Sequence, residues 1–129
     1  MKQPEDLARR FLALADRDIR AFLKLAGDPE IDDEVVGFDA QQAVEKCLKA
    51  VLAKHRVELR KTHDLQLLIK LLTQHNLPSL PLREGIDALG PFAVEFRYDF
   101  MTTEPLDREQ ARTVVAGVRS WAEQQVFSN

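Results

Sequence analysis

Apolar residues recur along this chain at intervals of three and four, which is the spacing of helices that bury one face. The pattern predicts helices over residues 4–26, 38–54, 63–75, 82–100 and 107–127. No stretch alternates apolar and polar residues in the manner of a half-buried strand. The chain is therefore expected to be all-α, an up-and-down bundle of four to five helices.

The predicted helix over residues 38–54 carries the broadest apolar face. From the centre of this face outward, its residues are Ala40, Val44, Cys47, Leu48 and Val51, followed by Ala43, Ala50 and Leu52. A face this broad needs more than one neighbour to cover it, so we expect this helix to be central in the bundle. Because one chain would not cover every such face, we also predict a homodimer.

Three other predicted helices show capping residues or irregularities. The apolar stripe of the first helix consists of Leu7, Phe11, Leu14, Ala21, Phe22 and Leu25. Asp18 lies near the middle of this stripe. Gly90 and Pro91 interrupt the fourth helix, where we expect a kink or a restart. Asp107 and Gln110 are spaced as a capping box at the start of the last helix.

Length and composition narrow the class of protein. A chain of 129 residues fits one domain, over residues 1–129, and is long enough to bury a core without disulfides or metals. Acidic residues outnumber basic ones 21 to 18, so no global positive field favours non-specific nucleic-acid binding. The N-terminal segment lacks the apolar core of a signal peptide, and no apolar run is long enough to span a membrane. A soluble, cytoplasmic protein is expected.

The chain holds none of the familiar enzyme signatures. Its single cysteine, Cys47, lies in an apolar run and is expected to be buried and unreactive. No group of histidines and cysteines has the spacing of a metal site, and neither a phosphate-binding glycine loop nor a serine-hydrolase motif occurs. The sequence therefore predicts no catalytic residue, no metal and no cofactor.

Asp18 is the polar residue that fits its position least. A carboxylate within an apolar stripe needs a partner, because burying it unpaired costs several kcal/mol. The candidate partners are Lys46, Lys49, His63 and Arg97. Two interpretations are open at this point: a buried structural ion pair, or the polar centre of a ligand cleft.

Polar residues gather on the second predicted helix. Glu45 and Lys49 are spaced i,i+4, and together with Gln42 and Lys46 they share one side of the helix, which a solvated face would explain. Lys46 and Lys49 could instead contact phosphate. Gln41 differs from the others because it borders the apolar face, where its amide needs hydrogen-bond partners.

Two further candidates lie at a helix start and on the fourth helix. Thr62 is expected to cap the third helix, with Asp64 in its first turn. His63 lies at the same end, where a helix N-terminus attracts anions, and it could bind a ligand or only cap the chain. Arg97 lies at the edge of the apolar stripe of the fourth helix. Three interpretations are open for its side chain: it extends to water, it pairs with a carboxylate, or it holds a phosphate. Tyr98 follows it directly.

Four segments of the chain together resemble the HEPN family, the small helical nucleotide-binding domains of higher eukaryotes and prokaryotes. They are ADRDI from residue 15, QQAVEKCLKA from residue 41, KTHDL from residue 61 and FRYD from residue 96. The first is similar to an A-x-x-D-[LI] pattern and the second to a Q-A-x-E-K-x-L-K-A pattern. The order and spacing of the four segments, which extend over nearly the whole chain, carry the resemblance.

The resemblance implies a helical bundle like the substrate-binding domain of nucleotidyltransferases such as the kanamycin-modifying enzyme, often dimeric. Family members commonly act with a minimal nucleotidyltransferase as toxin–antitoxin modules. We therefore expect a nucleotidyltransferase partner, a nucleotide or RNA as ligand, and no membrane. In this interpretation Asp18 organises the cleft, phosphates are held by Lys46, Lys49 and Arg97, and the rim is formed by His63 and Tyr98.

Some HEPN proteins are metal-independent ribonucleases with an R-x(4–6)-H motif, from which this chain departs. No histidine follows Arg97 at that distance, and Arg56 and His63, which have the spacing, lie in the connector before the third helix. The resemblance therefore favours a non-catalytic HEPN protein that binds a nucleotide or another phosphate-containing ligand. Two alternatives stay open: a ribonuclease toxin that combines Arg97 with a histidine such as His63, and a plain helical interaction module.

Overall fold

The computed structural model describes residues 3–59, 61–93 and 105–128, and every regular element in these ranges is helical. The elements in chain order are α1 (Pro4–Ala26), α2 (Asp33–Lys54), α3 (Leu65–Gln74), α4 (Arg83–Asp87), the 3-10 helix η1 (Gly90–Phe92) and α5 (Arg108–Phe127). The prediction of an all-α bundle is confirmed. Within the described ranges, none of these helices combines the length and the apolar character needed to cross a membrane.

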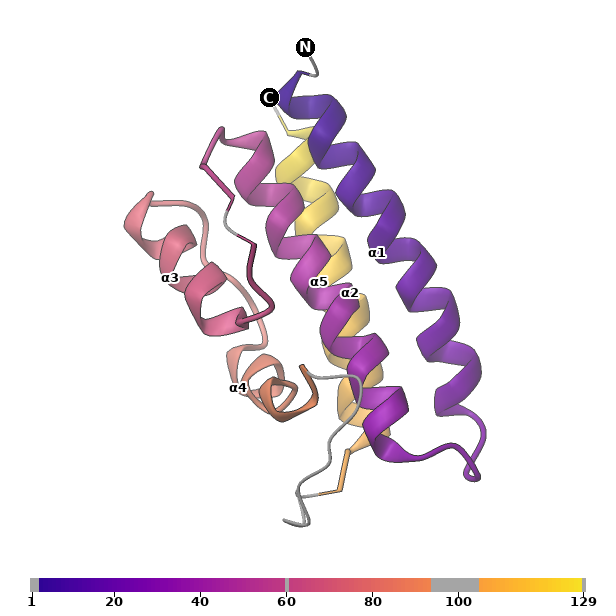
Figure 1. The fold of residues 1–129 in the computed structure, drawn as a ribbon. Helices are drawn as coiled ribbons and strands as arrows, with labels where there is room; N and C mark the ends of the chain where they lie inside the picture. Colours follow the sequence, from indigo (N-terminus) through magenta and orange to yellow (C-terminus); the bar gives the residue numbers. More distant parts are fainter. Residues whose placement is uncertain (1–2, 60, 94–104, 129) are drawn as a thin grey trace.

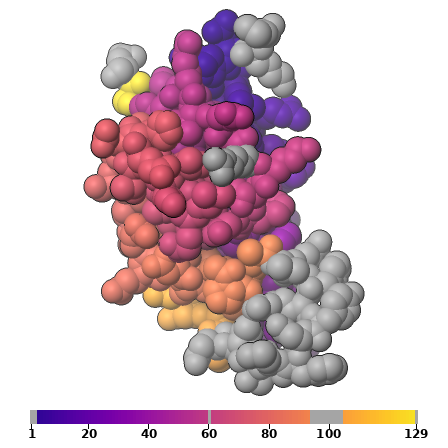
Figure 2. Space-filling model, turned by 60° about the vertical axis from the view of Figure 1, so that its left-hand side comes forward, coloured from indigo at the N-terminus to yellow at the C-terminus, as the bar shows by residue number. Residues whose placement is uncertain are grey.

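The bundle is built around three long helices, α1, α2 and α5, that lie side by side (Figure 1). The shorter α3 and α4 lie on the side of α2 that faces away from α1. Both ends of the chain lie at the same end of the bundle. Figure 2 shows the face on which α3 and the segment that precedes it, in pink, lie above the orange residues of α4 and η1.

Proline or aspartate residues mark the starts of three helices close to the predicted positions. Pro4 begins α1, where its missing N–H is not needed. The side chain of Asp107 accepts a hydrogen bond from the Gln110 N–H at 2.9 Å and so caps α5. The cap of α3 is Asp64 rather than the predicted Thr62, because the Asp64 carboxylate accepts from the Gln66 N–H at 2.9 Å. Helix α3 consequently starts at Leu65, two residues after the predicted start.

Helix α2 is the central helix, as its broad apolar face predicted. It starts at Asp33, five residues before the predicted start. All eight residues of the predicted face are buried: Ala40, Ala43, Val44, Cys47, Leu48, Ala50, Val51 and Leu52. Helices α1, α5 and α3 all pack against α2, so one chain covers this face by itself. The breadth of the face therefore no longer argues for a homodimer, which stays a prediction.

The buried face of α1 is rotated from the predicted stripe. Of the six residues predicted to form it, Phe22 is buried, Ala21 is exposed and the four others are only half-buried. The residues that reach the core are instead Ala8, Leu12, Ala15, Phe22 and Ala26. Three of these five are alanines, and Leu12 and Phe22 supply the large side chains that α1 places in the core. Asp18 therefore lies at the edge of the buried face and not in its middle.

The predicted fourth helix over residues 82–100 is wrong as a single element. Leu82 has a left-handed backbone (φ 61°), and α4 runs only from Arg83 to Asp87. The chain restarts as η1 at Gly90, next to the residue pair where an interruption was expected. Helix α4 packs tightly on α5, since a Cβ on Gly85 would lie 2.2 Å from Val114 Cγ2. The remainder of the predicted helix lies outside the described residues.

Arg108 joins three helix ends at the bottom of the bundle. Its guanidinium donates to the carbonyl oxygen of Ala26 at 3.2 Å and to that of Asp28 at 2.9 Å, in the turn after α1. It also donates to Asp33 Oδ1, at the start of α2, at 3.1 Å. One side chain thereby satisfies carbonyl groups that the end of α1 leaves unpaired. This clamp fixes the direction in which α2 leaves α1.

Candidate functional site

A buried carboxylate, Glu45, lies at the centre of a polar cluster between α2 and the connector that leads to α3. Only 2% of its side chain is exposed. Its Oε1 lies 2.8 Å from Nδ1 of His63, and its Oε2 accepts from Nζ of Lys49 at 3.1 Å. We call Gln41, Gln42, Glu45, Lys49 and His63 the Glu45 network. The prediction of a solvated face is wrong for Gln42 and Glu45, which are both buried.

The two glutamines of the Glu45 network tie the connector to α2. Gln41, which is fully buried, donates from Nε2 to the backbone oxygen of His63 at 2.9 Å. Its Oε1 accepts from Nε2 of Gln42 at 2.8 Å, and that same nitrogen lies 3.5 Å from Glu45 Oε1. These contacts supply the partners that the amide of Gln41 was expected to need. A buried network whose members are all paired fixes one arrangement of its side chains.

Asp18 pairs with Lys46, one of the four partners considered for it. The two side chains form an ion pair between α1 and α2, and about 15% of each remains exposed (15% for Asp18 and 16% for Lys46). The pair adjoins the Glu45 network, since Lys46 directly follows Glu45 on α2. Asp18 is therefore one half of a mostly buried ion pair.

The charges of this region nearly cancel. Carboxylates at Asp18 and Glu45 face ammonium groups at Lys46 and Lys49, and His63 adds a positive charge only when its ring is protonated. Both lysines are thus occupied by carboxylates. A phosphate that approached either lysine would have to compete with a carboxylate that is already in place.

His63 is the exposed member of the Glu45 network. About two thirds of its side chain (69%) faces solvent, and Nε2 makes no hydrogen bond to any residue that the structure describes. A hollow of about 320 Å³ opens beside the ring, at the start of α3. Its lining consists of His63, Asp64, Leu65, Gln66, Gly90 and Ala93. The imidazole is therefore held by a buried group on one side and open to a ligand on the other.

The structure brings together most of the residues that the sequence singled out. Asp18 contacts Lys46, and Lys49 and His63 meet on the same carboxylate. Arg97 and Tyr98 lie outside the described residues. Sequence reasoning missed Glu45 as the centre of the cluster. The signal was its spacing from Lys49 together with the adjacent glutamines, which only a fold that returns the connector to α2 turns into a network.

Cys47 points into the core, as predicted. Burial disfavours its thiolate and raises the pKa of the thiol from 9.0 to about 12; the charge of Arg119 lowers the pKa and that of Asp16 raises it by smaller amounts. In the ranges that the structure describes, no cluster of three or more histidine, cysteine, aspartate or glutamate side chains is arranged to hold a metal ion.

The fold defines a small all-helical domain in which a central helix carries a buried polar network. Comparison with known families agrees with this description, since the HEPN domain model matches residues 8–125. The chain belongs to the HEPN domain family. No curated protein and no solved structure matches it.

Proposed function

We propose that this HEPN-domain protein binds a nucleotide or another phosphate-containing ligand and acts with a minimal nucleotidyltransferase partner, as one component of a toxin–antitoxin-type module. Family membership over residues 8–125 supports the proposal, because small HEPN proteins commonly occur in such pairs. The observation that carries the ligand part is the Glu45–His63 contact, which presents a fixed imidazole at the wall of a hollow.

The hollow beside His63 has a suitable size and chemistry for part of a nucleotide. Its volume of about 320 Å³ lies at the lower end of the range of small-molecule sites. Leu65, Gly90 and Ala93 supply apolar surface, and the imidazole of His63 supplies a donor for a phosphate oxygen when it is protonated. The N-terminus of α3 also lies at this hollow, but its partial positive charge is compensated by the Asp64 carboxylate that caps it, so the phosphate contact depends on His63.

Lys46 and Lys49 have a supporting role in this proposal. Each is held by a carboxylate and is about one-seventh exposed (16% and 14%), so neither presents a free ammonium group. A bound phosphate would draw on their positive charge at a distance or would displace Asp18 or Glu45. His63 therefore makes the direct contact, and the lysines hold Glu45 and Asp18 in place.

Isothermal titration calorimetry with ATP, GTP and a dinucleotide tests the ligand part. We expect binding by the native protein and at least tenfold weaker binding by His63→Ala, since a charge-assisted hydrogen bond contributes about 1.5–3 kcal/mol. His75→Ala is the matched control, because His75 is exposed at the end of α3 and lines no part of the hollow. No heat of binding at millimolar ligand, with or without the partner, would overturn this part of the proposal.

Co-expression tests the partner. The nucleotidyltransferase encoded in the adjacent reading frame, where one is present, should co-purify with this chain through size exclusion. Expression of this chain alone should arrest growth, and co-expression of the nucleotidyltransferase should relieve the arrest. Separate elution and no effect on growth would argue against a paired module.

Light scattering of the purified protein measures its mass and so tests the predicted homodimer.

The Glu45–His63 contact also favours a second function, metal-independent RNA cleavage. A buried carboxylate that holds Nδ1 of an imidazole, with Nε2 directed to solvent, is the arrangement of a general base. Such a base would take the proton of a 2′-hydroxyl, which then attacks the adjacent phosphorus and expels the 5′-oxygen.

Incubation of RNA with the protein in the presence of a metal chelator tests this function. Cleavage should be lost in His63→Ala and in Arg97→Ala and kept in His75→Ala; intact RNA with the native protein would count against it.

A further inference from the structure

The outward face of α1 carries a line of basic side chains. Arg10, Arg17 and Lys24 are spaced by seven residues, which is close to two helical turns, and Arg20 lies between the last two. All four side chains are exposed. The line is about 21 Å long, given a rise of 1.5 Å per residue. We call Arg10, Arg17, Arg20 and Lys24 the basic stripe.

The basic stripe has no partner among the described residues, because the acidic residues of central α1 are turned to its two sides. Asp16 accepts from Nε of Arg119, on α5, at 2.7 Å. Asp18 pairs with Lys46 on α2. None of the four stripe residues forms an ion pair or a hydrogen bond through its side chain within the ranges that the structure describes. The outward face of α1 therefore carries an excess of positive charge, with four cations in line against one exposed carboxylate, that of Asp6 in the first turn.

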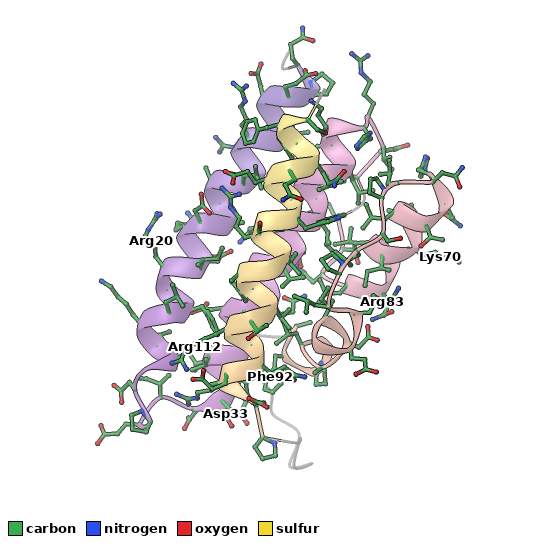
Figure 3. The ribbon with its side chains drawn as sticks, turned by 180° about the vertical axis from the view of Figure 1, so that it is seen from behind. Arg20, Asp33, Lys70, Arg83, Phe92 and Arg112 are labelled. Atoms are coloured by element: carbon green, nitrogen blue, oxygen red, sulfur yellow. The ribbon has the colours of Figure 1, made fainter. Side chains whose placement is uncertain are left out.

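The absence of ion-pair partners distinguishes the stripe from two other arginines near the surface of this protein. Arg83 pairs with Asp87, and Arg112 pairs with Glu109, each on its own helix. Figure 3 shows Arg20 extending from α1 on the opposite side of the bundle from Arg83 and Lys70. Over the whole chain, acidic residues outnumber basic ones 21 to 18, so composition alone does not produce a surface of one positive sign.

The chemistry of the stripe fits a phosphate backbone better than a protein partner. Protein interfaces place apolar and aromatic side chains at their centre, whereas the other exposed residues along the stripe are Ala13, Ala21 and Leu23, of which only Leu23 is large and none is aromatic. Nucleic-acid interfaces are more polar and much more positively charged. Three of the four stripe residues are arginines, whose planar guanidinium matches phosphate oxygens in pairs.

We propose that the basic stripe binds the phosphodiester backbone of single-stranded RNA without reading its sequence. The stripe presents no aromatic side chain on which a base could stack, so the contacts are electrostatic. This inference does not rest on the proposed function, because the stripe lies on α1 and the hollow lies at the start of α3. Each phosphate contact releases counterions, and four contacts to a single strand give a slope of log K against log salt of about −3.

Fluorescence anisotropy with labelled oligouridine, titrated at several salt concentrations, tests the proposal. We expect a dissociation constant in the micromolar range, about 10⁻⁴–10⁻⁶ M, near physiological salt. In Arg17→Gln/Arg20→Gln the affinity should fall about tenfold and the salt slope should lose about 1.4, since each single-strand contact contributes about 0.7. Lys70→Gln/Arg83→Gln removes as many charges from the opposite side and should change neither quantity by more than about twofold. Circular dichroism checks that both variants are folded.

The same assay contains the outcomes that overturn the proposal. Equal losses in the stripe variant and the control variant would show that only net charge matters. No change in anisotropy at low salt would exclude the surface as a nucleic-acid site. If polyglutamate at equal charge competes with oligouridine and binds more tightly, the stripe is a site for an acidic protein instead.

Discussion

The interior side of α2 and the outward side of α1 carry similar charged side chains in opposite states. On α2, Glu45 is almost fully buried and has partners on both oxygens, while Lys46 is paired across to α1. On α1, Arg17 and Arg20 are exposed and have no partner in the described part of the chain. The first set is fixed by the protein, and the second is free for something outside it.

This difference teaches which charges the fold needs. Removing one member of a buried pair strands the other in a poorly solvated place, which is strongly destabilising. Removing an exposed, unpaired charge strands nothing. Mutation of the charged residues on α2 should therefore lower the stability of the protein, whereas mutation of those on α1 should weaken binding to a ligand.

The thiol of Cys47 should show the largest effect of burial on α2. Its pKa is raised from 9.0 to about 12, so at a pH below both values the thiolate population of the folded protein is about a thousandfold lower than that of the unfolded chain. Because the folded pKa is raised, the associated stability is complete below pH 9 and is lost as the pH rises towards about 12. A thiol-reactive dye should label the native protein very slowly and the urea-unfolded chain fast.

The matched control for Cys47 is a thiol on the surface of α5. Ala116 is exposed, so Ala116→Cys in a Cys47→Ser background should react in the folded protein at the rate of a free thiol. Fast labelling of native Cys47, at a rate comparable with that of this control, would contradict the burial of this part of α2.

Glu45→Ala should give the next largest effect. The free energy of unfolding should fall by about 2–3 kcal/mol, because the buried glutamine amide loses an acceptor and Lys49 loses its carboxylate. The exposure of His63 keeps the loss below that of a fully buried pair. Urea denaturation measures it. Glu58→Ala, at an exposed position of the connector, should change stability by less than about 0.5 kcal/mol. Equal effects of the two variants would disprove a stabilising Glu45 network.

Local signals in the sequence decide which helix ends can be predicted from it. The bounds of α1 and α5 agree with the prediction within about a residue, because Pro4, Gly27 and Asp107 mark their ends in the sequence itself. The fourth predicted helix failed because its apolar spacing continues through Gly90, whereas the folded chain turns there. The close contacts on either side of Gly90 join distant segments, since Gly85 packs on Val114 of α5 and Phe92 packs on Gly37 of α2, and such packing leaves no periodic trace in the sequence.

The candidate site was harder to predict than the fold. A helical wheel shows which side chains share a face, but it does not show what covers that face. Glu45 appeared solvated because its cover, the connector with His63, is 18 residues away in the sequence. The pairing of Asp18 with Lys46 was among the alternatives, since an inward carboxylate demands a cation. Which cation it takes depends on how α1 is rotated, and the buried face of α1 is rotated from the stripe that the periodicity predicts.

A double-mutant cycle on Asp18 and Lys46 should give a smaller but measurable effect. We expect a coupling of about 1 kcal/mol in the free energy of unfolding, because both side chains are mostly shielded from water. The comparison pair is Arg83 and Asp87, whose side chains are about half exposed (50% and 49%) and should couple by less than about 0.5 kcal/mol. If the coupling free energy of Asp18 and Lys46 is no larger than that of the surface pair, their ion pair is exposed to solvent and not shielded.

Arg17→Gln/Arg20→Gln should have the smallest effect on stability. The unfolding free energy should change by less than about 0.5 kcal/mol, since neither guanidinium has a partner to lose within the described ranges. A slight gain is expected, because two neighbouring positive charges on one helix face repel each other. Urea denaturation of the samples used for the anisotropy assay measures both properties together. A fall as large as that of Glu45→Ala would mean that the stripe is bound to its own chain, and the division between the two helices would then fail.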